Sequence, residues 1–170
     1  STLAAGLAQT LAQKNEGPVL LLEVQGSGRS LEMLGLEHAR FENTAIYGQK
    51  DIWGAKILPR ETFRQYFDLL LAMGKEKSVW ATATAGLRDR LVDVVFENKV
   101  VSAFIETCPG LEPAVLLGKL HWEATHGHTP EMDRPWAHVV VDAPSTGHGV
   151  MLFKSAFALT EVFSSGIISK

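Results

Sequence analysis

Asp142 and the small residues that follow it are the side chains of this sequence best suited to binding a metal-bound phosphate. Asp142 comes directly after a run of valines at 139–141, and the sequence PSTGHG follows at 144–149. Such an apolar run is typical of a strand buried on both faces of a parallel sheet. Ligands of open α/β sheets bind outside the carboxyl ends of the strands, which is where this pattern places the carboxylate. The hydroxyl groups and glycines of 144–149 permit close approach of a ligand to the backbone.

The elements around Asp142 must hold it at the end of a strand and before a helix. Residues 150–160 predict that helix. A strand, a carboxylate, a small-residue loop and a helix, in this order, form the magnesium and phosphate-sensing region of P-loop nucleotidases. An Asp after a valine run also occurs where it merely caps a turn, so a purely structural turn is the alternative.

A second apolar run, at 18–24, predicts another buried parallel strand, and the loop QGSGRS follows it at 25–30. Gly26, Gly28 and Arg29 of this loop could approach a phosphate group. The alternative is a plain turn between the strand and a short helix that opens at 31–36.

Helices account for most of the remaining chain. Leucines recur every four positions within 1–14, where Ser1 or Thr2 can cap a helix that ends near Gly17. A strand is expected near 53–58, and Pro59 is well placed to begin the next helix. Apolar periodicity predicts further helices through 87–95, 100–106 and 111–124, with a break at 109–110.

The chain between the second strand and the Asp142 strand contains more helices than the single helix that a crossover between parallel strands needs. We therefore expect an α/β core at 1–58 and 136–170 and a helical insertion at 59–125. The apolar stripes at 63–71 and 111–120 could form either core or a groove, and the sequence does not separate these two interpretations.

Composition limits the classes of function. The 170 residues are 46% hydrophobic and 21% charged, as in an ordinary soluble globular domain, and a net charge of −3 without a basic region argues against a nucleic-acid partner. Cys108 is the only cysteine, which excludes an intrachain disulfide framework and a thiol zinc site within this chain and fits a cytoplasmic protein. The histidines at 121, 126, 128 and 138 match no strong metal-ligand spacing, and we expect them to be solvated loop residues.

Three segments, in the same order along the chain, resemble the ArsA-like family of P-loop ATPases, which contains anion pumps and tail-anchored-protein-targeting factors. The segment VVVDAPSTGHGVMLFK at 139–154 resembles the switch II motif of this family, D-x-A-P-T-G-H. The segment PVLLLEVQGSGRSLEMLG at 18–35 takes the place of switch I, and CPGLEPAVLLGKLHWE at 108–123 resembles the helix that precedes switch II. The resemblance covers nearly the whole chain.

The resemblance implies a site for ATP and Mg²⁺. The sequence STLAAGLAQTLA at 1–12 resembles the continuation of a Walker-A loop, whose glycines and lysines are absent from these residues. It implies that Ser1 and Asp142 hold the metal, and that the helix opened by Thr2 faces the phosphates. Further implied nucleotide-binding residues lie in the two strand-end loops: Gly26, Gly28, Pro144, Thr146, Gly147 and His148.

Members of the family carry an aspartate in switch I that positions the attacking water, and this sequence has Gln25 in that place. A glutamine can orient water without acting as a base. Glu23 is a candidate substitute, because it points to the same face of the strand as Gln25 if the strand continues that far.

The sequence thus predicts an α/β fold with a mostly parallel sheet flanked by helices, of the P-loop nucleotidase type, with a helical insertion between switch I and switch II. It indicates a partial ATPase domain over 1–170, which the resemblance expects to work as a homodimer and to carry a protein or membrane-helix cargo on the insertion. For these 170 residues alone we expect weak or absent ATP binding. The alternatives are a non-catalytic interaction module of the same fold and an unrelated α/β domain with a fortuitous DAPSTGHG.

Overall fold

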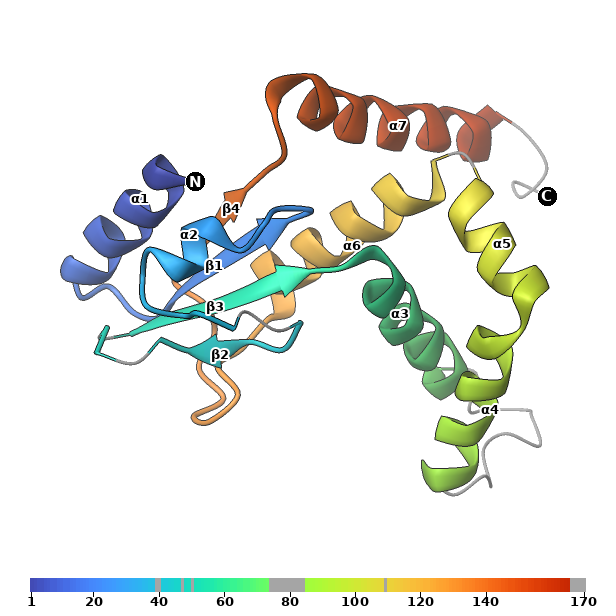
Figure 1. The fold of residues 1–170 in the computed structure, drawn as a ribbon, viewed down its shortest axis with the longest axis horizontal. Coiled ribbons are helices and arrows are strands. Elements are labelled where there is room, and N and C mark those ends of the chain that lie inside the picture. Colours follow the sequence, from blue (N-terminus) through green and yellow to red (C-terminus); the bar gives the residue numbers. More distant parts are fainter. Residues whose placement is uncertain (39–40, 47, 50, 74–84, 109, 166–170) are drawn as a thin grey trace.

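The computed structural model describes residues 1–170 except 39–40, 47, 50, 74–84, 109 and 166–170 (Figure 1). The described residues form a four-stranded sheet of order β2-β3-β1-β4, flanked by helices, which confirms the α/β class and the mostly parallel sheet. β1 pairs in parallel with both β3 and β4, and β2 pairs antiparallel with β3. The strands are β1 (Val19–Val24), β2 (Thr44–Ala45), β3 (Ile52–Ile57) and β4 (His138–Asp142).

β1 is the central strand of the sheet, and all six of its residues are buried. Leu21 faces Gly54 of β3 on one side and Val140 of β4 on the other. β4, by contrast, lies at an edge of the described sheet, and Val141 is 38% exposed. The prediction that 139–141 are buried on both faces is therefore wrong, because a run of valines does not say whether its strand is central or at an edge.

α1 (Thr2–Gln13) covers one face of the sheet and packs on β1 and β4. It does so through Ala5, Ala8 and Ala12, while Leu3 and Leu7 are exposed. Small side chains let the helix backbone approach the sheet closely, so the alanine face rather than the leucine face is the buried one.

The helices between β3 and β4 begin where the sequence predicts them, the first at Pro59. They are α3 (Pro59–Met73), α4 (Ala85–Glu97), α5 (Lys99–Thr107) and α6 (Leu111–His126). Gly110, with a φ of +80°, stands before α6 as its N-cap, and Pro109 lies outside the described residues. The short helix after β1 is α2 (Arg29–Glu32).

α6 covers the face of the sheet opposite α1. Leu116 is fully buried with Leu20, Leu22 and Trp136, and Leu152 of α7 (Thr146–Ser165) joins the same cluster. α6 and α7 also pack against each other, whereas α3, α4 and α5 extend beyond the carboxyl ends of the strands (Figure 1). The last helix of the region at 59–125 is thus part of the core beneath the sheet.

α7 begins at Thr146, four residues before the predicted helix, so the connection from β4 is only 143–145. The expected loop at 144–149 is therefore wrong beyond Ser145, and the two glycines of this segment lie in the first turn of a helix. The amide of Gly149 donates to the carbonyl of Ser145, 2.9 Å away, and this bond lies in that first turn. None of the described helices has the length and apolar character that crossing a membrane requires.

Candidate functional site

The amino end of α1 and the carboxyl ends of β1 and β4 meet at one place in the fold. Glu23 of β1 stands opposite Asp142 of β4 in the parallel register, so both strands end level with each other. The terminal ammonium group of Ser1 forms an ion pair with Oδ1 of Asp142, at 3.3 Å. The structure thus brings together Ser1 and Asp142, the two residues that the sequence predicts to bind metal.

The amino end of α1 is exposed and carries no side-chain cap. Ser1 is the N-cap residue and makes no side-chain capping hydrogen bond, and the first turn contains no acidic residue. The first N–H groups of a helix have no partner within the helix, and the helix dipole favours negative charge beside them. Thr2, the first helical residue, is exposed at this end.

The side chains of Ser1 and Asp142 carry oxygen atoms of the kind that coordinate a divalent cation. A hydroxyl and a carboxylate are oxygen ligands of the kind that Mg²⁺ prefers, and proteins usually hold Mg²⁺ through one or two carboxylates and the phosphates of the substrate. The Asp142 side chain is 14% exposed, so it is accessible without being fully solvated. A hydroxyl and a carboxylate are thus present here as oxygen ligands of the kind that Mg²⁺ accepts, and the ammonium group of Ser1 is the cation that pairs with Asp142 in this structure.

The residues after Asp142 are mostly exposed and sit at the start of α7. Thr146, Gly147 and His148 occupy the first helical turn, and Pro144 lies in the short connection before it. Ser145 Oγ and His148 Nδ1 are 3.3 Å apart. Among the hydrogen bonds of the described residues, none joins 144–148 to Ser1 or to the loop after β1.

Glu23 is bound inside the loop after β1 and is only 1% exposed. Its carboxylate accepts hydrogen bonds from the amides of Gly28 and Ser30 and from Ser30 Oγ, the last at 2.6 Å. A Cβ on Gly26 would lie 2.0 Å from Glu23 Oε1, so this side chain needs a glycine beside it. Gly28, with a φ of +92°, is the N-cap of α2. The contacts of Glu23, Gly26 and Gly28 are those of a strand-to-helix turn built around a buried carboxylate.

Gln25 does not share a face with Glu23, because β1 ends at Val24 and Gln25 turns the chain with a φ of +53°. The expectation that both side chains point the same way depended on a longer strand and is wrong. Gln25 is exposed and donates a hydrogen bond from Nε2 to Oε1 of Glu112, in the first turn of α6. No sequence pattern indicates this partner, because an acidic residue in the first turn of a helix is common on account of the helix dipole.

The expectation that the histidines at 121, 126, 128 and 138 are solvated loop residues is wrong for three of them, because His121 and His126 lie in α6 and His138 lies in β4. His126 Nδ1 lies 2.7 Å from Thr125 Oγ1, and His138 Nε2 lies 3.0 Å from Glu16 Oε2. In the part of the chain that the structure describes, no group of three or more histidine, cysteine, aspartate or glutamate side chains is arranged to hold a metal.

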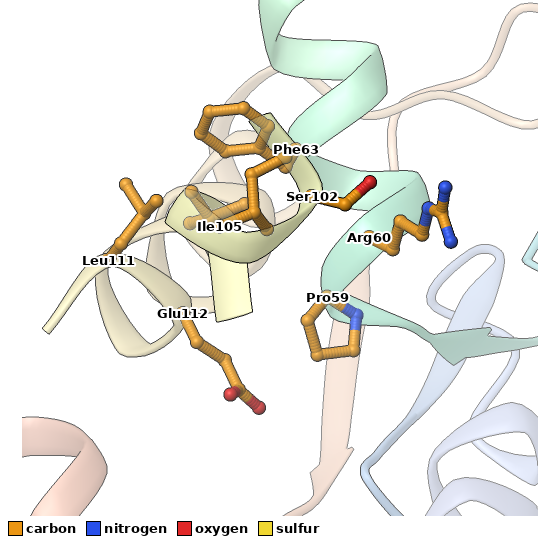
Figure 2. Close-up of a pocket in the computed structure, with 8 residues that line it drawn as sticks. Pro59, Arg60, Phe63, Ser102, Ile105, Leu111 and Glu112 are labelled. Atoms are coloured by element: carbon orange, nitrogen blue, oxygen red, sulfur yellow. The ribbon is translucent and has the colours of Figure 1, made fainter. Parts of the chain in front are cut away.

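Two adjoining cavities lie among the helices beyond the sheet. The larger, of about 670 Å³, lies between α3 and α6, and its walls are mainly apolar. The smaller, of about 110 Å³, lies between α3, α5 and α6 (Figure 2). Phe63, Leu111 and Val115 line both, and Glu112 lies at the smaller one. The stripes at 63–71 and 111–120 therefore contribute residues to cavity walls as well as to packing, and Glu112 connects these walls to Gln25.

Comparison with models of known protein families finds no match for this chain, and no curated protein matches it either.

Proposed function

We propose that this chain is part of an ATPase that resembles the ArsA-like family and uses Mg-ATP to change the position of its helical region. The observation that carries the proposal is the contact of Ser1, at the amino end of α1, with the Asp142 carboxylate, which is an ion pair of 3.3 Å with the terminal ammonium group. It places a helix amino end and a strand-end carboxylate side by side, and these are the two protein elements that bind a phosphate and its metal in nucleotidases.

In this proposal the Ser1 hydroxyl and the Asp142 carboxylate hold Mg²⁺, and the first N–H groups of α1 bind phosphate oxygens. Bound Mg²⁺ supplies charge neutralisation for phosphoryl transfer, a reaction that depends mainly on positioning and electrostatics. The 170 residues contain no glycine-rich lysine loop, so they provide only part of the phosphate site. Thr146, Gly147 and His148, at the exposed start of α7, are proposed to sense the terminal phosphate.

Gln25 is proposed to orient the attacking water and to connect the nucleotide with the helices. Its hydrogen bond to Glu112 reaches the first turn of α6, next to the cavities between the helices. Gly26 and Gly28 are proposed to let the backbone of this loop approach a phosphate. Loss of the terminal phosphate would release this loop and so change the position of α6.

The larger cavity between α3 and α6 is the proposed site for cargo or an effector. Its volume of about 670 Å³ and its mainly apolar walls suit an apolar side of a protein segment, such as a membrane helix. The proposal further includes a homodimer in the cytoplasm, as the family resemblance implies.

Asp142→Asn tests the proposal in the full-length protein. It removes the metal-binding charge at nearly constant size, and we expect magnesium-dependent ATP turnover to fall at least about tenfold, equivalent to about 1.4 kcal/mol. Asp93→Asn is the matched control, because Asp93 pairs with Arg64 on the exposed surface of α4. Unchanged turnover in Asp142→Asn contradicts the role of Asp142.

The alternative is a non-catalytic interaction module of the same fold. The burial of Glu23 favours it, because this carboxylate is used by the loop and Gln25 cannot act as a base. A full-length protein that binds an apolar ligand but shows no magnesium-dependent binding of ATP would establish this alternative and contradict the ATPase.

A further inference from the structure

The loop after β1 carries one basic side chain, Arg29, which stands between two residues that bind Glu23. Arg29 is exposed, and its side chain forms no hydrogen bond or ion pair with the residues that the structure describes. We propose that Arg29 binds the terminal phosphate of the nucleotide and stabilises its charge during hydrolysis. This inference rests on the proposed function and adds a residue to its site.

The backbone of Arg29 is held in place on both sides. The amides of Gly28 and Ser30 both donate to the buried carboxylate of Glu23, the second at 3.1 Å. The carbonyl of Arg29 accepts from the amide of Met33, 3.1 Å away, in the turn of α2. Gly28 and Ser30 are buried whereas Arg29 between them is exposed, so only its side chain leaves the loop. A side chain on a fixed backbone binds a ligand at a lower cost in conformational entropy.

The loop lies at the same end of the sheet as the proposed metal site formed by Ser1 and Asp142. It begins directly after β1, and Glu23 of β1 is the register partner of Asp142. α2, which begins at Arg29, packs against α1, the helix that Ser1 caps. Gln25, which is proposed to orient water beside the terminal phosphate, belongs to the same loop as Arg29. A phosphate between Asp142 and Gln25 therefore lies next to the loop that carries Arg29.

The charges at this end of the sheet call for a cation beside the phosphate. Glu23 and Asp142 end neighbouring strands, and Glu112 in the first turn of α6 contacts the loop after β1. That loop and residues 143–149 contain one arginine or lysine between them, which is Arg29. Carboxylates repel a phosphate unless positive charge lies close to it. A guanidinium group keeps its charge at any physiological pH and binds phosphate oxygens through paired N–H donors.

Arg29→Ala tests the inference in the full-length protein, with magnesium-dependent ATP turnover and equilibrium binding of ATP and ADP as readouts. We expect kcat to fall at least about 100-fold, because the reacting phosphate loses its stabilising charge. The affinity for ATP should fall more than that for ADP, which lacks the terminal phosphate. Arg29→Lys should retain part of the turnover, since it keeps the charge and loses the planar fork. Arg90→Ala is the matched control, because Arg90 is exposed on α4, outside the two strand-end loops.

Chemical rescue separates a phosphate contact from a structural role of Arg29. Guanidinium chloride at concentrations that do not unfold the protein should restore turnover of Arg29→Ala saturably and leave Arg90→Ala unchanged. Turnover of Arg29→Ala within about twofold of the unmodified protein overturns this inference and leaves the ATPase standing. Equal losses of affinity for ATP and ADP without rescue also overturn it, since Arg29 then only shapes the loop. Absence of magnesium-dependent ATP binding by the unmodified protein overturns the proposed function and this inference together.

Discussion

At the scale of single residues, two carboxylates at the ends of neighbouring strands are register partners but differ in how deeply they are buried. Glu23 and Asp142 are register partners, yet Glu23 is 1% exposed and accepts three hydrogen bonds from its own loop. Asp142 retains an accessible side chain beside the nitrogen of Ser1. One carboxylate therefore builds the loop, and the other is available for a ligand.

Gly26→Ala should destabilise the protein, because its new Cβ would lie 2.0 Å from Oε1 of the buried Glu23 side chain. Overpacking of this kind costs typically about 1–3 kcal/mol. Gly6→Ala is the control, since nothing lies within 4 Å of a Cβ at Gly6 in α1, and there alanine should stabilise by up to about 1 kcal/mol. Urea unfolding measures both changes. Equal stability of the two variants would contradict the described packing around Glu23.

Gln25→Ala should slow ATP hydrolysis in the full-length protein while it leaves the affinity for ATP nearly unchanged, if Gln25 orients water. Single-turnover rates and equilibrium binding of ATP separate these effects. Glu112→Ala is the control, because it removes the partner of Gln25 on α6 while Gln25 keeps its own amide side chain. A loss of ATP binding in Gln25→Ala would instead indicate that this residue only shapes the loop.

At the scale of elements, α6 joins the parts of the molecule that carry its chemistry. Its first turn contacts Gln25 through Glu112, its middle packs on β1 through Leu116, and its last turns hold Glu123. Glu123 in turn binds Trp136, just before β4. The middle of the helix therefore packs on the sheet, its end is bound to the segment before β4, and its first turn contacts the loop after β1.

Glu123→Ala should destabilise the protein by about 3–5 kcal/mol, because it leaves the ammonium of Lys119 buried without its countercharge. Asp93→Ala is the matched control, since the pair of Asp93 with Arg64 is about half exposed and such pairs contribute at most about 1 kcal/mol. Urea unfolding should therefore distinguish the two variants clearly. A similar, small loss in both would show that the ion pair on α6 is solvated.

At the scale of the whole molecule, the corner of Ser1 and Asp142 lies at the carboxyl ends of the strands, and the helices α3, α4 and α5 extend beyond them (Figure 1). The apolar cavity lies between α3 and α6, and it shares Gln65, Lys119 and Trp122 with a polar cavity of about 290 Å³, so these two cavities adjoin.

Gly118→Leu should fill part of the apolar cavity and weaken the binding of an apolar dye such as Nile red about tenfold. Gly118 lines this cavity, and nothing lies within 4 Å of a Cβ placed there, so the new side chain can enter open space without strain. Gly86→Leu on α4 is the control, because its Cβ also meets nothing within 4 Å and it lies outside the cavity. Equal dye binding by both variants would contradict an apolar binding site between α3 and α6.

Periodicity predicted the position of most elements, including β1, β3 and the helices from α3 to α6. It missed β2, whose two residues are too few to show a pattern. It also placed the start of α7 too late, because the glycines at 147 and 149 suggested a loop. Local sequence does not show that packing of α7 against α6 stabilises a helix containing these glycines.

Apolar runs and turn residues act locally, so they were sufficient to place most strands and helices along the chain, β2 excepted, and to identify Asp142 at the end of a strand. The tertiary structure was needed to show that β1 rather than β4 is the central strand, that Glu23 is buried within its own loop, and that Ser1 lies beside Asp142. It also decided that Gln25 contacts Glu112, 87 positions away. These features depend on contacts between residues far apart in the chain, and the spacing of residues in one sequence carries no record of such contacts.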